Sequence, residues 1–258
     1  MNGARNGILA GLSATLTLHA APALTALTPL RRALLPALAG VGRSGHIALT
    51  FDDGPDPQST PRFLELLATY DIRATFFLLG TMLDRSPGLG RDLVAAGHEV
   101  AVHGWAHRCL LWRTPRATYD DIARARDRIS ELTGSPPRWY RPPYGVLTAG
   151  ALIACQRLSL TPMLWTAWGR DWRAAATPQS IFRTATRTLT GGGTLLLHDS
   201  DCTSATGSWR RTLAGLPALF DWAAERHLLL GPLREHGHGT ARGGSEMTDM
   251  ASGRSITG

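Results

Sequence analysis

Two neighbouring aspartates, Asp52 and Asp53, close a short apolar run and precede Gly54 and Pro55. Adjacent carboxylates repel each other unless a proton or a cation lies between them, so the pair indicates a metal site or a general base. Asp, Gly and Pro are also common turn formers, and the pair alone fits a plain turn equally well. Other residues that could do chemistry follow along the chain, and together they favour the catalytic interpretation: His103, His107, Arg141, Asp171 and His198.

A divalent metal held by Asp53, His103 and His107 fits these residue types. Two histidines four positions apart can face one ion if the chain turns once between them, although this spacing alone is a weak motif. One carboxylate then completes three protein ligands and leaves a position for water or substrate, which is typical of catalytic metal sites. Such a metal polarises a carbonyl group and lowers the pKa of water, as hydrolysis of an amide or ester requires.

Hydrolysis also needs a base and an acid. Asp52, next to the metal ligand, is the expected base for the attacking water, and His198 is the expected acid for the leaving amine. Arg141 could hold Asp52 ionised through a charge-assisted pair, and Asp171 could do the same for a protonated His198. The alternative for Arg141, which precedes Pro-Pro-Tyr, is a rigid loop without a catalytic role.

Short apolar runs alternate with segments of helical period, which predicts parallel βα units. Helices are expected to begin at Thr60-Pro61, Thr118 and Thr177-Pro178, with Gly134 ending the second. Strands are predicted at 47–51, 74–79, 99–103, 138–141, 161–165, 194–198 and 228–230.

The polar residues fall at or just after the carboxyl ends of these predicted strands. Both barrels and open α/β sheets place active sites at that edge, but a barrel brings the ends of more strands around one point. The sequence therefore predicts a barrel-like α/β fold.

The chain has 258 residues, 43% of them hydrophobic, enough for one sizeable core. All 27 basic side chains are arginine, and the formal net charge is +7. The arginines are scattered and no nucleic-acid motif accompanies them, so nucleic-acid binding is not expected. The positive charge would suit an anionic cell-wall polymer, but composition alone indicates only non-specific association.

Three segments are expected along the chain. Residues 1–44 form an apolar leader, which could be a signal peptide with a cleavage site at Ala21-Pro22-Ala23, an uncleaved anchor, or an arm packed on the domain. Residues 45–232 form the catalytic domain, and residues 233–258 are predicted to be a disordered tail. The leader favours export or membrane association at the cell envelope, with a cytoplasmic location left open.

Read in order, five segments resemble the motifs of the polysaccharide deacetylase family, the NodB-homology domain. The likeness runs from about Gly45 to Leu230 and is highly specific, because all five stand in the family's order. The segments are Thr50-Phe51-Asp52-Asp53-Gly54-Pro55, His103-Gly104-Trp105-Ala106-His107, Arg141-Pro142-Pro143-Tyr144, Asp171-Trp172 and Leu196-Leu197-His198-Asp199.

The resemblance implies a distorted (β/α) barrel of about seven parallel strands and metal-dependent removal of N-linked acetyl groups from sugars. The expected cofactor is a divalent metal, Zn²⁺ first, with Co²⁺ or another divalent ion as alternatives. The resemblance agrees with the roles given above. It alone implies that the Tyr144 backbone amide is an oxyanion donor and that Leu196 lines the acetyl pocket. Trp172 is expected either to pack or to line a sugar site.

One position departs from the family pattern, because Gly104 stands where Ser or Thr usually follows the first histidine. The missing hydroxyl is expected to loosen metal affinity without removing a ligand. An O-acetyl esterase, a deformylase and a silent carbohydrate-binding homologue remain alternatives. The substrate is a polymer, oligosaccharide or glycolipid with an N-acetylhexosamine, and the sequence leaves the oligomeric state open.

Overall fold

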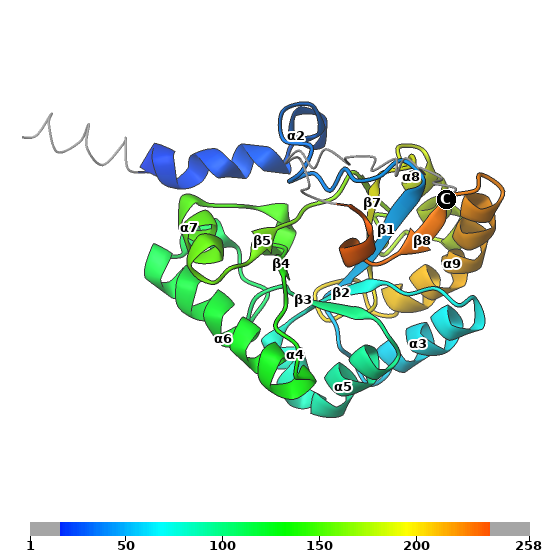
Figure 1. Ribbon diagram of the computed structural model, residues 1–258, viewed down its shortest axis with the longest axis horizontal. Coiled ribbons are helices and arrows are strands. Elements are labelled where there is room, and N and C mark those ends of the chain that lie inside the picture. The colour runs from blue at the N-terminus through cyan, green and yellow to red at the C-terminus, as the bar shows by residue number, and fades with distance from the viewer. Residues whose placement is uncertain (1–15, 238–258) are drawn as a thin grey trace, which may run out of the picture.

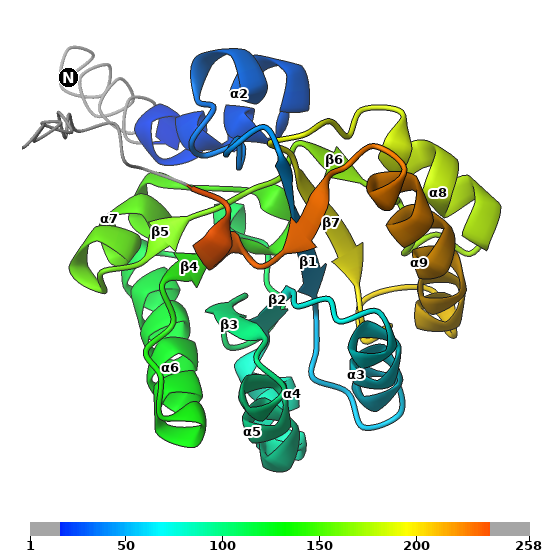
Figure 2. The same ribbon diagram turned by 45° about the vertical axis from the view of Figure 1, so that its right-hand side comes forward.

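Eight short parallel strands form the centre of the protein in its computed structural model, which describes residues 16–237. The strands are β1 (His46–Asp52), β2 (Thr75–Leu78), β3 (Glu99–Val102), β4 (Trp139–Tyr140), β5 (Thr161–Pro162), β6 (Ala167–Trp168), β7 (Thr194–His198) and β8 (Leu229–Gly231). Their order is β5-β4-β3-β2-β1-β7-β6, and β8 pairs with the start of β1. The sheet is curled, with its two ends at β5 and β6 (Figure 2).

The middle of this sheet is β1, all seven residues of which are buried. A strand that is covered on both faces favours a continuous apolar run, and this explains the nearly unbroken apolar sequence from Ile47 to Phe51. The parallel register aligns Asp52 with His198 at the end of β7. The pairing therefore brings two of the predicted catalytic residues, 146 positions apart in sequence, to the same edge.

Helices cover the outside of the curled sheet (Figure 2). The longer ones are α3 (Thr60–Thr69), α5 (Pro87–Ala95), α6 (Pro115–Thr133), α7 (Ala149–Arg157), α8 (Pro178–Thr186) and α9 (Ser208–Ala224). Shorter ones are α2 (Thr28–Leu34), α4 (Gly80–Arg85), and the 3-10 turns η1 (Ala21–Ala26), η2 (Leu110–Trp112), η3 (Pro143–Gly145) and η4 (Leu233–Glu235). The core between helices and sheet includes Phe51, Phe63 and Phe76, and the ring of Phe51 lies 5.2 and 5.1 Å from the other two.

The predicted fold class is confirmed, and each of the seven predicted strands is present. The prediction missed β6, because a two-residue strand carries no periodicity of its own. The start of α6 was predicted one turn too late. Thr114 accepts a hydrogen bond from the Ala117 amide and Pro115 occupies the first turn, whereas Thr118 is buried inside the helix.

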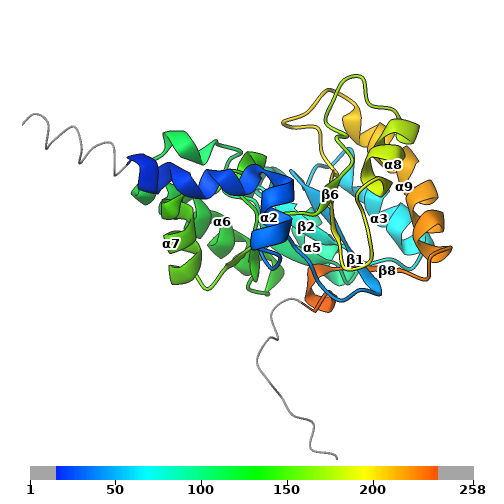
Figure 3. The same cartoon turned by 90° about the horizontal axis from the view of Figure 1, so that it is seen from above.

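The N-terminal segment, residues 21–44 with η1 and α2, lies over the two ends of the sheet. In Figure 2, α2 is placed between the β5 side and the β6 side, and Figures 1 and 3 show α2 from two other directions. Arg31 of α2 is 1% exposed, and its guanidinium donates to the backbone carbonyls of Thr25 and Trp165 at 2.5 Å each. The Leu164 amide donates to the Leu38 carbonyl at 2.9 Å. This segment thus holds the stretch of chain that joins β5 to β6.

Parts of the predicted leader and tail, residues 1–15 and 238–258, lie outside the described residues. At the described end, Leu233 is buried and its amide donates to the Thr75 hydroxyl, and His236 is buried against His46. The segment boundaries at 44 and 232 stay predictions. Within residues 16–237, no helix combines the length and apolar character needed to cross a membrane.

Candidate active site

A pocket of about 230 Å³ opens at the carboxyl edge of the sheet. Seven of the ten residues singled out from the sequence line it: Asp52, His103, His107, Tyr144, Trp172, Leu196 and His198. The other three, Asp53, Arg141 and Asp171, are fully buried behind these lining residues. The structure thus brings all ten to one place, although they come from five separate stretches of the chain.

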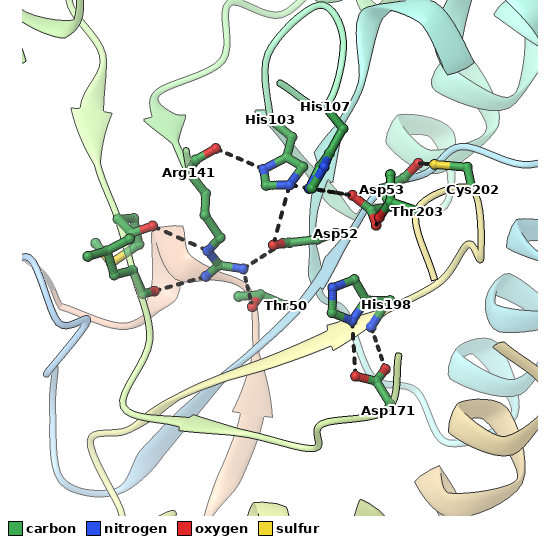
Figure 4. A network of polar contacts seen from close by, with 12 residues as sticks. Thr50, Asp52, Asp53, His103, His107, Arg141, Asp171, His198, Cys202 and Thr203 are labelled. Atoms are coloured by element: carbon green, nitrogen blue, oxygen red, sulfur yellow. Dashed lines mark hydrogen bonds and ion pairs between the residues drawn. The ribbon is translucent and has the colours of Figure 1, made fainter. Parts of the chain in front are cut away.

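Three donor groups meet beneath the pocket. The Nε2 atoms of His103 and His107 lie 3.4 and 3.6 Å from Oδ1 of Asp53, and the three ligand atoms lie within 4.8 Å of one another (Figure 4). Nδ1 of His103 contacts the Arg141 carbonyl at 2.8 Å, which fixes the ring and leaves Nε2 as the free lone pair. The backbone of Asp53 is left-handed, with φ of 80°, so its side chain diverges from that of Asp52.

The chemistry of this donor set fits a cation. Oδ1 of Asp53 is buried, and no hydrogen-bond donor among the described residues contacts it. Burial opposes ionisation of Asp53, but the neighbouring imidazoles of His103, His198 and His107 hold its pKa below the usual range. Burial and the neighbouring His103 lower the pKa of His107 to about 4, which keeps its imidazole neutral. An ionised carboxylate and a neutral imidazole are the forms that bind metals.

Asp52 belongs to a separate polar network. Its Oδ1 accepts a hydrogen bond from Nη1 of Arg141 at 2.7 Å, and the same nitrogen donates to the Thr50 hydroxyl at 2.9 Å. The rest of the guanidinium donates to the carbonyls of Met163 and Leu164, at 3.2 and 3.0 Å. Burial lowers the pKa of Arg141, which Asp52 opposes. The pair is one buried cation on one buried anion, and each of the three guanidinium nitrogens makes at least one hydrogen bond.

His198 faces the pocket from the end of β7 and is held by Asp171. Its Nδ1 lies 3.0 Å from Asp171 Oδ1, and its backbone amide donates to Oδ2 at 2.8 Å (Figure 4). The Thr212 hydroxyl also donates to Oδ2, at 2.9 Å. Burial disfavours a charged imidazole, but the Asp171 carboxylate outweighs it and raises the pKa of His198 to about 10. His198 is therefore a protonated, oriented donor at neutral pH.

Aromatic and apolar groups form the walls. The Tyr144 ring lies edge-on to His107, with centroids 4.4 Å apart, and its backbone has φ of 59° in the turn η3. Leu196, from β7, is 4% exposed. The Trp172 ring lies 5.7 Å from the imidazole of His198. A small apolar group can therefore enter beside the polar residues without leaving protein contact.

Sequence reasoning missed two supporting groups. The Thr203 hydroxyl donates to Oδ2 of Asp53 at 2.5 Å, from a loop after β7. Asp121, on α6, accepts a hydrogen bond from the Trp105 amide at 2.8 Å, in the loop between the two histidines. Each lies far in sequence from the group it contacts, and a single Thr or Asp in a polar segment carries no local signal.

Comparison with known proteins identifies the family. The polysaccharide deacetylase family profile matches residues 39–163. The chitooligosaccharide deacetylase of Bradyrhizobium sp. (strain ANU 289) is 34% identical over 201 residues, which cover 75% of this chain and 91% of that protein. The chain belongs to the polysaccharide deacetylase family.

Two further relatives extend the likeness. The peptidoglycan-N-acetylglucosamine deacetylase of Listeria monocytogenes serotype 1/2a (strain 10403S) is 32% identical over 62% of this chain, which spans only 34% of that longer protein. A family 4 carbohydrate esterase from Streptomyces lividans, solved with acetate, is 31% identical with a TM-score of 0.66 over 73% of this chain and 93% of that one. Family and fold thus agree with the resemblance drawn from the motifs.

Gly104 has a structural reason in this chain. Its φ is +103°, and a Cβ there would lie 2.9 Å from Oδ2 of Asp121, the oxygen that accepts from Trp105. The Asp121 carboxylate thus occupies the space into which a side chain at residue 104 would point, and it stabilises the loop between His103 and His107 through its bond to the Trp105 amide.

We predict that Gly104→Ser, which restores the residue type common in the family, destabilises this protein by about 1–3 kcal/mol, because a side chain would be strained at this φ. The measurement is urea unfolding of the metal-stripped protein. Gly45→Ser is the control, because a Cβ on Gly45 meets nothing within 4 Å. Equal or greater stability of Gly104→Ser would contradict the structural reason for a glycine at this position.

Proposed function

We propose that this protein is a metal-dependent hydrolase that removes N-linked acetyl groups from N-acetylated sugars of a polysaccharide, oligosaccharide or glycolipid. One observation carries the proposal: a His-His-Asp donor set lies at the same pocket that Asp52 and His198, a carboxylate and an imidazole suited to proton transfer, line from two different strands. The names of the relatives support it, since they are deacetylases of chitooligosaccharides and of peptidoglycan N-acetylglucosamine.

In this proposal Asp53, His103 and His107 hold the divalent ion. Two imidazole nitrogens and one carboxylate oxygen suit Zn²⁺, and Co²⁺ accepts the same donors. When bound, the ion supplies Lewis acidity to the acetyl carbonyl and to the attacking water. The Thr203 hydroxyl and the Arg141 carbonyl orient two of the ligands through the hydrogen bonds described above.

Asp52 serves as the general base. Its Oδ1 is occupied by Arg141, while Oδ2 lies 3.8 Å from Nε2 of His103, on the side of the ligand cluster. A proton from the attacking water is taken up by this carboxylate. Arg141 fixes the orientation of Asp52 through a charge-assisted hydrogen bond to Oδ1, so that Oδ2 faces the reacting atoms.

His198 serves as the general acid. It enters the reaction protonated because of Asp171, and it transfers that proton to the departing amine, whose nitrogen must be protonated to leave. The carboxylate of Asp171 also accepts hydrogen bonds from the His198 backbone amide and the Thr212 hydroxyl. These bonds fix Asp171 against Nδ1 of His198 and leave Nε2, on the other side of the imidazole, to give its proton to the amine.

The acyl group is recognised by Tyr144 and Leu196. The Tyr144 backbone amide is proposed to donate to the oxygen that becomes negative as water adds to the carbonyl. Leu196 lines the pocket beside Asp52 and His198 and offers an apolar contact for the acetyl methyl. A formyl group has no methyl to use this contact, so the pocket favours acetyl over formyl. Trp172, which lines the pocket, is proposed to pack on the sugar ring.

The protein is proposed to act at the cell envelope, as a carbohydrate-active enzyme that is exported or membrane-associated through its N-terminal residues. We also propose that residues 1–44 form a leader and residues 233–258 a tail, on either side of the catalytic domain. The peptidoglycan-directed relatives support an envelope substrate.

We predict that Asp52→Asn lowers kcat by about 10²- to 10⁴-fold, because the amide cannot accept the water proton. Acetate release from N-acetylated chitooligosaccharides measures this, and metal analysis checks that the variant still binds its ion. The exposed Asp120→Asn is the matched control on α6. An Asp52→Asn enzyme that turns over at the wild-type rate with full metal content would remove Asp52 as the base.

The pH profile tests the pair formed by His198 and Asp171. The raised pKa of about 10 keeps His198 protonated well above neutral pH. In Asp171→Asn the burial that lowers this pKa remains and the carboxylate that raises it is lost, so the alkaline limb of kcat/KM should move to lower pH. The exposed Asp221→Asn on α9 should leave the limb in place. An unmoved alkaline limb in Asp171→Asn would contradict the role of His198 as the acid.

A further inference from the structure

A second cavity, of about 780 Å³, lies beside the active-site pocket and shares the walls Trp165 and Trp168 with it. Three segments far apart in the chain form it: residues 26–33 of η1 and α2, residues 165–170 around β6, and residues 187–188 after α8. Each segment contributes one arginine. We call this space the arginine cavity, after Arg32, Arg170 and Arg187.

The three guanidinium groups lack counter-charges. Among residues 16–237, no carboxylate lies within 4.0 Å of any of them, whereas Arg116 and Arg128 elsewhere on the surface pair with acidic side chains. Like charges that line one space repel each other unless an anion lies between them. The arginine cavity is therefore a concentration of positive charge that the protein itself does not neutralise.

The other contacts of these arginines leave donors for a ligand. Nη1 of Arg32 reaches the Thr188 carbonyl only at 3.4 Å. Arg170 lies over the Trp168 ring at 4.9 Å, and its buried Nε has no hydrogen-bond partner among the described residues. A guanidinium packed on an indole presents its edge, with a fork of N–H groups that matches the oxygens of phosphate or carboxylate.

A row of tryptophans joins the arginine cavity to the proposed acid. The ring centroids of Trp165 and Trp168 lie 5.8 Å apart, those of Trp168 and Trp172 lie 5.3 Å apart, and Trp172 contacts His198. Indole rings are good packing surfaces for sugar rings. Trp165 is buried, whereas Trp168 and Trp172 are half-buried, so a substrate whose acetylated sugar reaches His198 would pass along Trp172 and Trp168 toward the three arginines.

We propose that the arginine cavity binds an oxyanion carried by the substrate next to its acetylated sugar, so that the preferred substrate is an anionic glycan or sugar phosphate rather than neutral chitin. The inference rests on the proposed function for the position of the acetylated sugar. Three cations favour a phosphate, which carries up to two negative charges, and a carboxylate has the same fork geometry. The cavity wall at residues 26–33 lies after the predicted cleavage site at residues 21–23, so cleavage there would keep these residues in the chain.

Equilibrium binding to the zinc-loaded protein tests this, read from tryptophan fluorescence. The three probes are diacetylchitobiose, its 1-phosphate, and the disaccharide of N-acetylglucosamine and N-acetylmuramic acid, which carries a carboxylate. We expect at least one anionic probe to bind about tenfold or more tightly than the neutral one, an advantage that Arg170→Gln/Arg187→Gln abolishes. Arg62→Gln/Arg116→Gln, two exposed arginines with their own acidic partners, is the control and should keep the advantage.

The outcomes separate the anion sources and the two proposals. Tighter binding of the phosphate alone supports a phosphorylated glycan, and tighter binding of the muramic acid probe supports a carboxylate glycan. Equal binding of all three probes would overturn the inference. An affinity advantage of the anionic probes that survives Arg170→Gln/Arg187→Gln would also overturn it, because the bound zinc ion rather than the arginines would then hold the anionic group. Acetate release from neutral oligomers without anion preference leaves the proposed function standing alone. Anion preference without any acetate release would support anion binding in the arginine cavity and would count against the proposed function.

Discussion

Two adjacent buried carboxylates, Asp52 and Asp53, are the constraint on which the rest of the site depends. Neighbouring ionised groups are stable out of water only when each has its own compensating charge. The left-handed backbone at Asp53 sends the two side chains apart, so Asp52 meets Arg141 while Asp53 faces His103 and His107. In the proposed mechanism one carboxylate thereby serves as a base and the other as a metal ligand. Two copies of the same chemical group are proposed for different roles because their surroundings differ.

The support for this arrangement reaches the edge of the fold. The guanidinium of Arg141 is buried and depends on the carbonyls of Met163 and Leu164, in the stretch that joins β5 to β6. That stretch is held in turn by Arg31 of α2, which donates to the Trp165 carbonyl. Hydrogen bonds to the carbonyls of three consecutive residues, 163 to 165, therefore connect α2 to Arg141 and, through Arg141, to the proposed base. The N-terminal segment also supplies one wall of the arginine cavity, so the same segment supports both the catalytic network and the proposed recognition of substrate charge.

The sequence predicts much of this architecture, and what it misses has physical reasons. Runs such as Ile47 to Phe51 identify buried parallel strands, and the order of polar residues after them locates the active-site edge. β6 is missed because it spans only two residues. Asp121 and Thr203 are missed because their partners lie 16 and 150 positions away, where only the fold brings them together. Gly104 looks like a weakness in the motif, but its positive φ and the adjacent Asp121 show that this loop is braced differently.

The central claim is that Asp53, His103 and His107 hold an ion on which N-deacetylation depends. The most direct measurement is acetate release from an N-acetylated glycan panel by protein stripped with a chelator and then reloaded with zinc, alongside metal analysis of each sample. We expect no acetate release from the stripped protein and recovery of release as one equivalent of zinc is restored. Acetate release that is the same with and without bound metal would contradict the central claim.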